Sequence, residues 1–425
     1  MRPRQQARKG RLNKQNPVNE RTSPGNKDDT MATIIPSLST AQIASLSTTT
    51  IAGLSTEDIA ALSTDQIVAL GTAQVAALST LGMSVLNTAQ VAAFETADIA
   101  ALSSGAIRAL STANIVALTS DQAAALTTTQ VAALSTQQVR ALQTDDLNAL
   151  GTAQFAALNT AQVGALSSAQ VANLESADLA AFGTAAVRAI STAGIASLST
   201  DNVVALSTAQ AAALTTSQLG ALRTDAMAAL ETADLVAIGS AGIRALSTAQ
   251  VNALVTDQMA ALATSQVAAL STGQVAALAS DDLNALGTAQ FAALTTTQVG
   301  ALTTAQVNNL ETADLAALGT AAVRAISTAG IAALTTDHIV ALSTAQAAAL
   351  TTAQIAKIES ADLAALETAD LVALGTAGVR ALDTAQMNAL TTDQMAALAT
   401  TQVAALSTTQ VAALITDNLN ALSTA

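Results

Sequence analysis

An eight-residue period runs through this chain without interruption from Leu38 to Leu422. Leu, Phe or Ile fills the first position of every octad, and Ser or Thr fills the third position from Thr40 to Thr424, with no insertion or deletion between them. One fixed short period indicates a repeat architecture in which each unit contacts only its neighbours. The chain of 425 residues is therefore predicted to form one linear array, residues 38–425, behind one tail, instead of two or three globular domains.

Within an octad, the apolar residues stand at the first and sixth positions, as in Leu70 and Val75. The sixth position and the first position of the next octad are three residues apart, so they share one face of a helical turn. A continuous helix is excluded, because eight residues overshoot two turns by about 80° and would spread the Leu stripe around the helix. A break is therefore expected in every octad.

The Ser or Thr at the third position is predicted to supply that break as the N-cap of a new helix. Glycine or asparagine at the second position is predicted to adopt the left-handed conformation just past a helix end. Val255 and Ile415 occupy the same position and would resist it. The residues expected to be left-handed are Gly71, Gly151, Gly183, Gly239, Gly287, Gly319, Gly375, Asn87 and Asn159.

These features predict an all-α fold, a repeat solenoid or superhelix of short two-turn helices with one helix per octapeptide. Such short helices are stable only when they pack on their neighbours. The alternative is a β-solenoid with two or three octads per coil. Val, Ile and Thr would suit strands, whereas the abundance of Ala, Leu and Gln favours helices.

Residues 1–37 are predicted to be a separate, disordered basic leader in front of the repeat array of residues 38–425. The first thirty residues are rich in Arg and Lys, lack an apolar run and show no period. They could act as a basic arm for nucleic acid or be an unstructured leader, and Met31 is expected to be the true start. No signal peptide is visible, because such a peptide needs a central apolar stretch.

A longer period lies inside the short one. The segment 146–151 returns as 282–287, which is seventeen octads later (282 − 146 = 136). A two-octad charge cassette recurs as well, with Glu, Ser or Thr, Ala and Asp followed by an Arg thirteen residues after the Glu. Either segment duplication carried these charges along, or each Arg pairs with an acidic residue of a neighbouring octad and fixes the register. The cassette pairs are Glu95 and Arg108, Glu175 and Arg188, Glu231 and Arg244, Glu311 and Arg324, and Glu367 and Arg380.

The composition excludes several kinds of chemistry. The chain has no Cys, Trp or Tyr, and His338 is its only histidine. No catalytic, cofactor-binding or metal site is predicted, and the chain is not expected to be an enzyme; His338 is interpreted as a surface variant. Aspartates at the fifth position could bind calcium weakly, but the glycine-rich nonapeptide of calcium-binding β-rolls is missing. The net charge of −14 argues against nucleic acid and anionic lipid as partners of the array, and no membrane insertion is expected.

Two resemblances follow from short motifs. Residues 350–358 resemble the opening of the DNA-reading repeats of TAL effectors, but only over nine residues and without the base-reading loop. Runs such as Ala-Leu-Thr-Thr-Ala-Gln-Val at 301–307 resemble octapeptide arrays of large bacterial secreted or surface adhesin-like proteins. The second resemblance covers 38–425 and implies a class, secreted or surface-exposed bacterial proteins, and not an activity.

The leading hypothesis is a non-enzymatic scaffold, spacer or adhesin-type stalk. The alternative is a binding module whose regular Thr and Ser rows recognise a repetitive ligand such as ice. The last octads are expected to leave apolar faces uncovered, which predicts end-to-end self-association that charges at Leu414 and Leu422 would suppress. The sequence identifies no specific ligand.

Overall fold

The computed structural model describes residues 33–422 and contains 48 short α-helices in this part of the chain, one in each octad. Helices of four to seven residues replace the predicted two-turn helices, so each makes between one and two turns. No strand occurs between residues 33 and 422. The all-α repeat solenoid is therefore confirmed, and the β-solenoid alternative is wrong.

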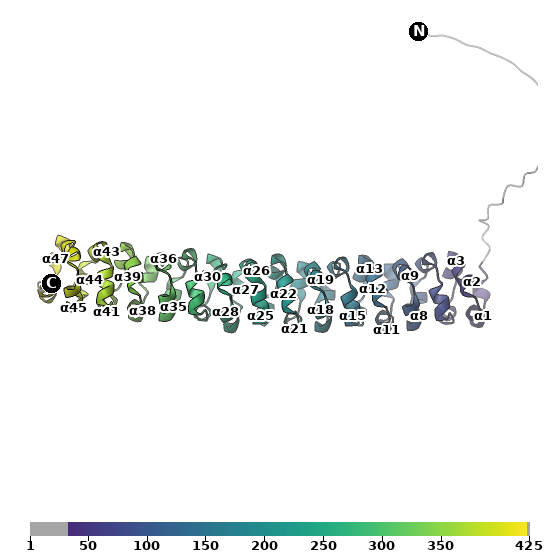
Figure 1. The fold of residues 1–425 in the computed structure, drawn as a ribbon. Helices are drawn as coiled ribbons and strands as arrows, with labels where there is room; N and C mark the ends of the chain where they lie inside the picture. The colour runs from purple at the N-terminus through teal and green to yellow at the C-terminus, as the bar shows by residue number, and fades with distance from the viewer. Residues whose placement is uncertain (1–32, 423–425) are drawn as a thin grey trace, which may run out of the picture.

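Each helix packs against the helix three places further along the chain, as α17 (Ser168–Ala172) does against α20 (Thr192–Ser197). Three octads therefore complete one coil, and the next coil lies directly on it. Figure 1 shows the described coils stacked into a straight rod that runs from α1 at one end to α47 at the other. Because every coil contacts only the coils before and after it, the fold is one-dimensional.

The helices share a start at the third position of the octad, except α26 and α43, which begin one residue earlier. The first half comprises α1 Thr40–Ala44, α2 Thr48–Ala52, α3 Thr56–Ala60, α4 Thr64–Val68, α5 Thr72–Ala76, α6 Thr80–Ser84, α7 Thr88–Ala92, α8 Thr96–Ala101, α9 Ser104–Ala109, α10 Thr112–Val116, α11 Ser120–Ala124, α12 Thr128–Ala133, α13 Thr136–Ala141, α14 Thr144–Asn148, α15 Thr152–Ala157, α16 Thr160–Gly164, α17 Ser168–Ala172, α18 Ser176–Ala181, α19 Thr184–Ala189, α20 Thr192–Ser197, α21 Thr200–Val204, α22 Thr208–Ala213, α23 Thr216–Ala221 and α24 Thr224–Ala229. The second half comprises α25 Thr232–Ala237, α26 Gly239–Ala245, α27 Thr248–Val251, α28 Thr256–Ala261, α29 Thr264–Val267, α30 Thr272–Ala277, α31 Ser280–Asn284, α32 Thr288–Ala292, α33 Thr296–Val299, α34 Thr304–Asn308, α35 Thr312–Ala317, α36 Thr320–Ala325, α37 Thr328–Ile331, α38 Thr336–Val340, α39 Thr344–Ala349, α40 Thr352–Ile355, α41 Ser360–Ala365, α42 Thr368–Ala373, α43 Gly375–Ala381, α44 Thr384–Ala389, α45 Thr392–Ala397, α46 Thr400–Ala404, α47 Thr408–Ala413 and α48 Thr416–Leu422.

The N-cap lies one residue earlier than predicted, at the second position of the octad. Ser63 is extended, with φ −76° and ψ 163°, and its hydroxyl accepts a hydrogen bond from Gln66 N–H. The Ser or Thr at the third position is instead the first helical residue, as Thr64 is in α4. The third-position assignment was therefore wrong, because the extended backbone that a cap requires falls one residue before that Ser or Thr.

The glycine prediction is right at two positions only. Gly239 and Gly375 have positive φ values of 68° and 70° and connect α25 to α26 and α42 to α43. The other glycines and asparagines predicted to be left-handed are extended N-caps, as Gly183 is with φ −67° and ψ 158°. Val255 is extended as well, with φ −85°, so it fits its junction without strain.

The core consists of the sixth and first positions of the octads, stacked along the inside of the rod except in the last described coil, where Val411 and Leu419 are exposed. Val75 is fully buried, and Leu78 is 5 % exposed. Phenylalanine fills the same core at Phe155, whose ring meets that of Phe182 edge to face with 5.8 Å between centroids. Aliphatic side chains, with few aromatic ones, thus fill the space between helices.

At the start of the array, a 3₁₀ helix, η1, spans Ile35–Ser37, and Ile35 is 3 % exposed against the first coil. The core therefore begins before residue 38, inside the segment assigned to the leader. For residues 1–32, the predictions of a disordered basic leader and of a start at Met31 concern residues outside the described range of 33–422.

The two left-handed glycines give a test of backbone strain. Gly239→Ala and Gly375→Ala are each expected to lower the free energy of unfolding by about 1 kcal/mol, because an L-residue resists positive φ. Gly183→Ala and Gly319→Ala are the matched controls, since these glycines have ordinary negative φ and nothing within 4 Å of the added Cβ. Urea denaturation of the four variants measures the difference, and equal losses at all four positions would contradict this account.

Candidate functional site

The polar site that recurs along the rod is the corner between successive helices. At the start of α23, Thr215 N–H donates to Gln218 Oε1 at 2.9 Å, and Gln218 N–H donates to Thr215 Oγ1 at 3.2 Å. Two backbone N–H groups at the helix end are satisfied in this reciprocal capping box. Gln218 is only 2 % exposed, so the fifth position of the octad faces inward.

The same glutamine links two coils. Gln218 Nε2 donates to the carbonyls of Val187 and Ile190, both at 2.9 Å, at the end of α19. Equivalent bonds to the previous coil occur in most corners, from Gln66, which bonds to Ile35 and Leu38, to Gln410, which bonds to Val379 and Leu382. A row of buried amides therefore closes helix ends and ties each coil to the one before it.

His338 occupies this inward position and is 3 % exposed, so its interpretation as a surface variant was wrong. Thr335 N–H donates to its Nδ1 at 3.0 Å, and its Nε2 lies 2.7 Å from the carbonyl of Leu310. The ring thus takes both roles of the usual glutamine, accepting at the cap and, in the Nε2–H tautomer, donating to the previous coil.

The cassette residues occupy three different environments. The Glu at the second position is an exposed N-cap without a side-chain cap hydrogen bond, as Glu231 is. The Asp three residues later is buried, and Asp234 is 1 % exposed. Arg244 lies at the exposed seventh position, and its Nε donates to the carbonyl of Ala269 in the next coil at 3.3 Å.

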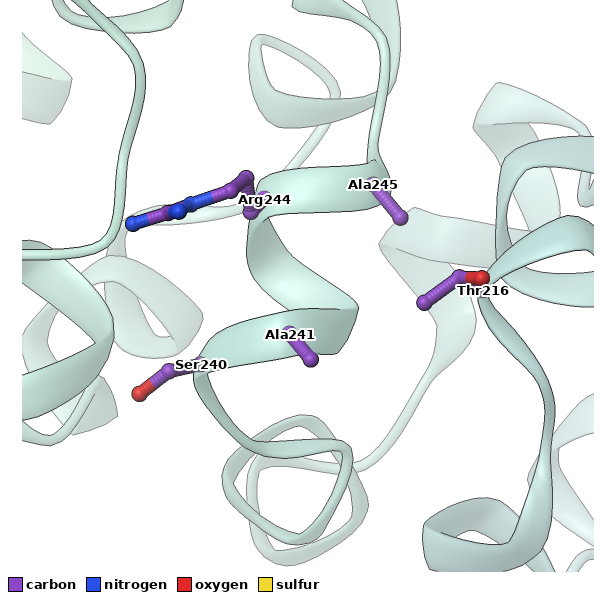
Figure 2. A pocket seen from close by; sticks show the side chains of 5 residues that line it. All are labelled: Thr216, Ser240, Ala241, Arg244 and Ala245. Carbon is purple, nitrogen blue, oxygen red and sulfur yellow. The ribbon is translucent and has the colours of Figure 1, made fainter.

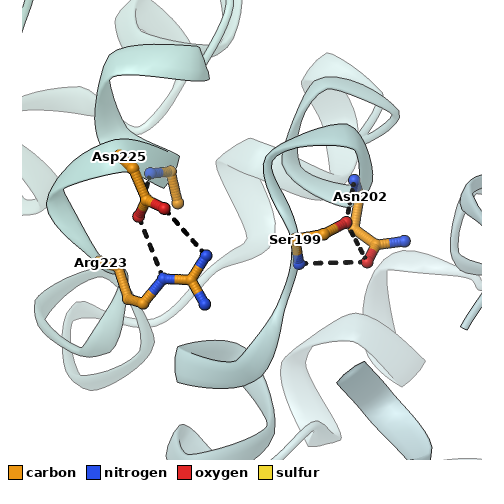
Figure 3. A network of polar contacts seen from close by, with 5 residues as sticks. Ser199, Asn202, Arg223 and Asp225 are labelled. Atoms are coloured by element: carbon orange, nitrogen blue, oxygen red, sulfur yellow. Dashed lines mark hydrogen bonds and ion pairs between the residues drawn. The ribbon is translucent and has the colours of Figure 1, made fainter. Parts of the chain in front are cut away.

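One ion pair occurs among residues 33–422, and the cassette does not contain it. Arg223 pairs with Asp225 at 3.0 Å, with side chains 48 % and 57 % exposed, beside the corner of Ser199 and Asn202 (Figure 3). The register-fixing Glu–Arg pair therefore stays a prediction, whereas the contact of Arg244 with a backbone carbonyl was not predicted. Such an exposed pair contributes little stability.

Buried aspartates replace glutamine in several corners. Burial raises the pKa of Asp178 to about 6 and of Asp314 to about 6, and repulsion from Glu175 and Glu311 adds to the rise. Burial also raises the pKa of Asp98, Asp146 and Asp282. The signal that could have revealed this environment is the capping-box spacing of Ser or Thr, any two residues, and Gln, which places the fifth position at a helix start.

A shallow depression of ≈ 520 Å³ opens on the surface between α23 and α26. It is lined by Thr216, Ser240, Ala241, Arg244 and Ala245 (Figure 2). The guanidinium of Arg244 points toward the next coil, and Ser240 Oγ donates to the carbonyl of Ser265 at 3.0 Å. Both polar side chains of the depression therefore already make contacts between coils. The depression gathers no set of groups that could carry out a reaction.

Between residues 33 and 422, no three His, Asp or Glu side chains are grouped so that they could hold a metal ion. None of the helices in this range has the length and apolar character needed to span a bilayer. The polar chemistry of the described residues is concentrated in the corners.

Comparison with known families gives one assignment. A model described as the ALTTAQ repeat matches in eight segments, 35–72, 91–128, 139–175, 171–208, 227–264, 275–312, 307–344 and 363–400, which together span more than half of the chain. A search of curated proteins found no match. The octads, their helices and the matched segments coincide, and the chain belongs to the ALTTAQ repeat family.

Proposed function

We propose that this chain is a non-enzymatic spacer that holds a fixed distance, as a secreted or cell-surface scaffold or adhesin-type stalk. The observation that supports this most is the row of buried amides, which ties coil to coil from Gln66 to Gln410. A rod whose neighbouring coils are joined by both apolar contacts and hydrogen bonds resists bending at any single point. No loop leaves the described array to carry a site of its own.

The distribution of charge around the rod supports the same role. The longer period of seventeen octads is not a whole number of three-octad coils, so equivalent residues fall on different faces. Glu175 and Glu311, for example, are separated by one such period and lie in different columns of helices, in the corners before α18 and α35. Charge is therefore spread around the rod instead of forming one binding face.

Deleting residues 208–255, which comprise two coils, tests the spacer role. Joining Ser207 to Thr256 keeps the octad register, so the rod is expected to shorten by about 16–20 Å, two helix spacings, at constant cross-section. Small-angle X-ray scattering measures both dimensions, and circular dichroism per residue is the control for folding. An unchanged length or a thicker particle would count against a spacer.

The same scattering series tests end-to-end association. In the last described coil, Val411, Ile415 and Leu419 are 46 %, 48 % and 50 % exposed, and a second copy could cover them. Particles of this chain are expected to lengthen with concentration without thickening. Charges at Leu414 and Leu422 should suppress the effect, and a strict monomer throughout the series would remove the proposal.

A second candidate function is recognition of a repetitive ligand such as ice. The Thr and Ser residues of the third position form exposed columns along the rod, for example Thr64, Thr88, Thr112 and Thr136, which follow each other at one-coil spacing. Caps use the second position of the octad and not the third, so capping does not explain why the third position is always Thr or Ser. Thermal hysteresis of a dilute solution would favour this candidate, and its absence would leave the spacer.

A further inference from the structure

Several corners of the rod carry a buried carboxyl group where most corners carry an amide, and two of these corners are also reached by an asparagine of the previous coil. Asp178 at the start of α18 and Asp314 at the start of α35 are 4 % and 3 % exposed and stand seventeen octads apart. An ionised carboxylate only accepts hydrogen bonds, so it cannot donate to the previous coil as Gln218 does. Asp314 Oδ2 has no hydrogen-bond partner.

The same corners contain a second acceptor without a donor. Asn284, at the end of α31, donates its Nδ2 to the carbonyl of Asn309 at 2.6 Å, in the corner directly before α35. Its Oδ1 is buried and has no partner, and Asn148 Oδ1 is in the same state before α18. These corners therefore lack a proton donor, and a buried acceptor that is left without a donor destabilises the fold.

Other corners show that a side chain as short as that of aspartate can reach the previous coil and donate a hydrogen bond to it. Asn114 Nδ2 donates to the carbonyl of Leu86 at 3.1 Å, and Asn202 Nδ2 donates to that of Leu174 at 3.0 Å. Figure 3 shows the other half of the arrangement, in which Ser199 N–H donates to Asn202 Oδ1. A protonated carboxyl has the same reach as asparagine and supplies one O–H donor.

The charge that acts on Asp178 is acidic, since Glu175 repels its ionised form, and Arg188 on the following helix α19 is exposed. Glu175 caps its own helix, and α15 and α17, which adjoin it, carry no charged residue. In α14, whose end reaches this corner, the charged residues are Asp145 and Asp146, and α21 in the next coil carries Asp201. No cation on these elements favours the ionised form of Asp178.

Asp314 has a similar setting, with repulsion from Glu311 and an exposed Arg324 on the following helix α36. Its own helix is capped by Glu311, and α32 and α34 carry no charged residue. In α31 the charged groups are Asp281 and Asp282, while α38 in the next coil carries Asp337 and the imidazole of His338. His338 is committed to the cap of α38 and the carbonyl of Leu310, so it does not replace the missing donor.

We propose that the corners of Asp178 and Asp314 are pH-sensitive joints in the rod. When the carboxyl takes up a proton, its O–H donates to the backbone carbonyl of Leu150 or Leu286, the counterparts of Leu86 and Leu174 in the asparagine corners, and couples the two coils. When the proton leaves for solvent, that bond is lost and a carboxylate remains among acceptors. The rod is therefore firmest in mild acid and loosens at these two joints as the solution becomes neutral.

The direction of the pH dependence follows from the thermodynamic linkage between proton binding and folding. The pKa of both groups is raised in the folded chain, from 3.8 to about 6, so the folded state holds the proton more tightly than an opened state does. The stabilising contribution is complete below about pH 4 and is lost as the pH rises through about 6. Local opening of the joint should therefore become more frequent across this window, whereas corners with glutamine have no such dependence.

Amide hydrogen exchange of the full chain, followed by mass spectrometry, tests the proposal against the double variant Asp178→Asn and Asp314→Asn. Rates in 176–182 and 312–318 are divided by those of the variant at the same pH, which cancels the intrinsic pH dependence of exchange. The ratio is expected to rise by about tenfold from pH 5 to pH 7.5 in these two segments. Segments with glutamine corners should keep a constant ratio.

The matched control replaces two exposed aspartates on the same two columns of helices, Asp201→Asn and Asp337→Asn. A ratio that does not change with pH in the joints, or that changes equally in the control, overturns the proposal. Should the asparagine variant fold poorly, Asp178→Gln with Asp314→Gln installs the residue of most other corners and must abolish the pH dependence. Infrared spectra of the unmodified chain add a direct readout, since two carboxylic acid groups should ionise near pH 6.

Discussion

Replacing Gln218 with alanine is expected to lower the free energy of unfolding by about 3–5 kcal/mol, because each buried polar group left without a partner costs about 1–3 kcal/mol. The side chain is 2 % exposed, and its removal leaves the N–H of Thr215 and the carbonyl of Ile190 without a partner. The carbonyl of Val187 loses one bond and keeps the one from the N–H of Ile190. Urea denaturation followed by circular dichroism measures the loss, which should also lower the cooperativity of the transition.

Gln42→Ala is the matched control for this prediction. Gln42 makes the same capping bond, from Ser39 N–H to Oε1 at 2.8 Å, but it lies in the first coil of the described array and is exposed. Its loss should cost about 1 kcal/mol, the typical contribution of a cap. The difference between the variants isolates the coil-to-coil part, and equal losses would show that the amide row does not couple the coils.

Phe155→Ala is expected to cost about 3–5 kcal/mol, because the substitution opens a cavity in a core that small side chains cannot easily refill. Phe155 is fully buried, and its edge-to-face contact with Phe182 is lost as well. Phe155→Val, which installs a residue common at this position, should cost less. Differential scanning calorimetry or urea denaturation ranks the variants by their stability to unfolding.

The exposed Val68 supplies the control for this second prediction. It is 49 % exposed on α4, so Val68→Ala should change the free energy of unfolding by no more than about 0.5 kcal/mol. A loss at Val68 as large as that at Phe155 would contradict this account, because alanine is the better helix former and burial would then not distinguish the two positions.

Much of the local structure could be predicted from the sequence. The octad with apolar first and sixth positions favoured a short helix broken once per unit over a β-solenoid, and the structure has such a helix in every described octad. The cap was placed one residue late, at Thr64 instead of Ser63, because both residues can act as caps and the period alone does not distinguish them. The capping-box partner Gln66 decides the matter, since its side chain bonds to the N–H of Ser63.

The sequence by itself determined that each octad holds one short helix and which face carries Leu and Val, since these follow from contacts within one octad and its neighbours. Only the tertiary structure decided that three octads make a coil, that Gln218 and His338 face inward, and that Gly183 is extended while Gly239 is left-handed. The inward position of the two polar side chains depends on partners in the previous coil, the carbonyls of Ile190 and Leu310. An eight-residue pattern is the same whichever coil lies beneath it, and for that reason it could not specify such contacts.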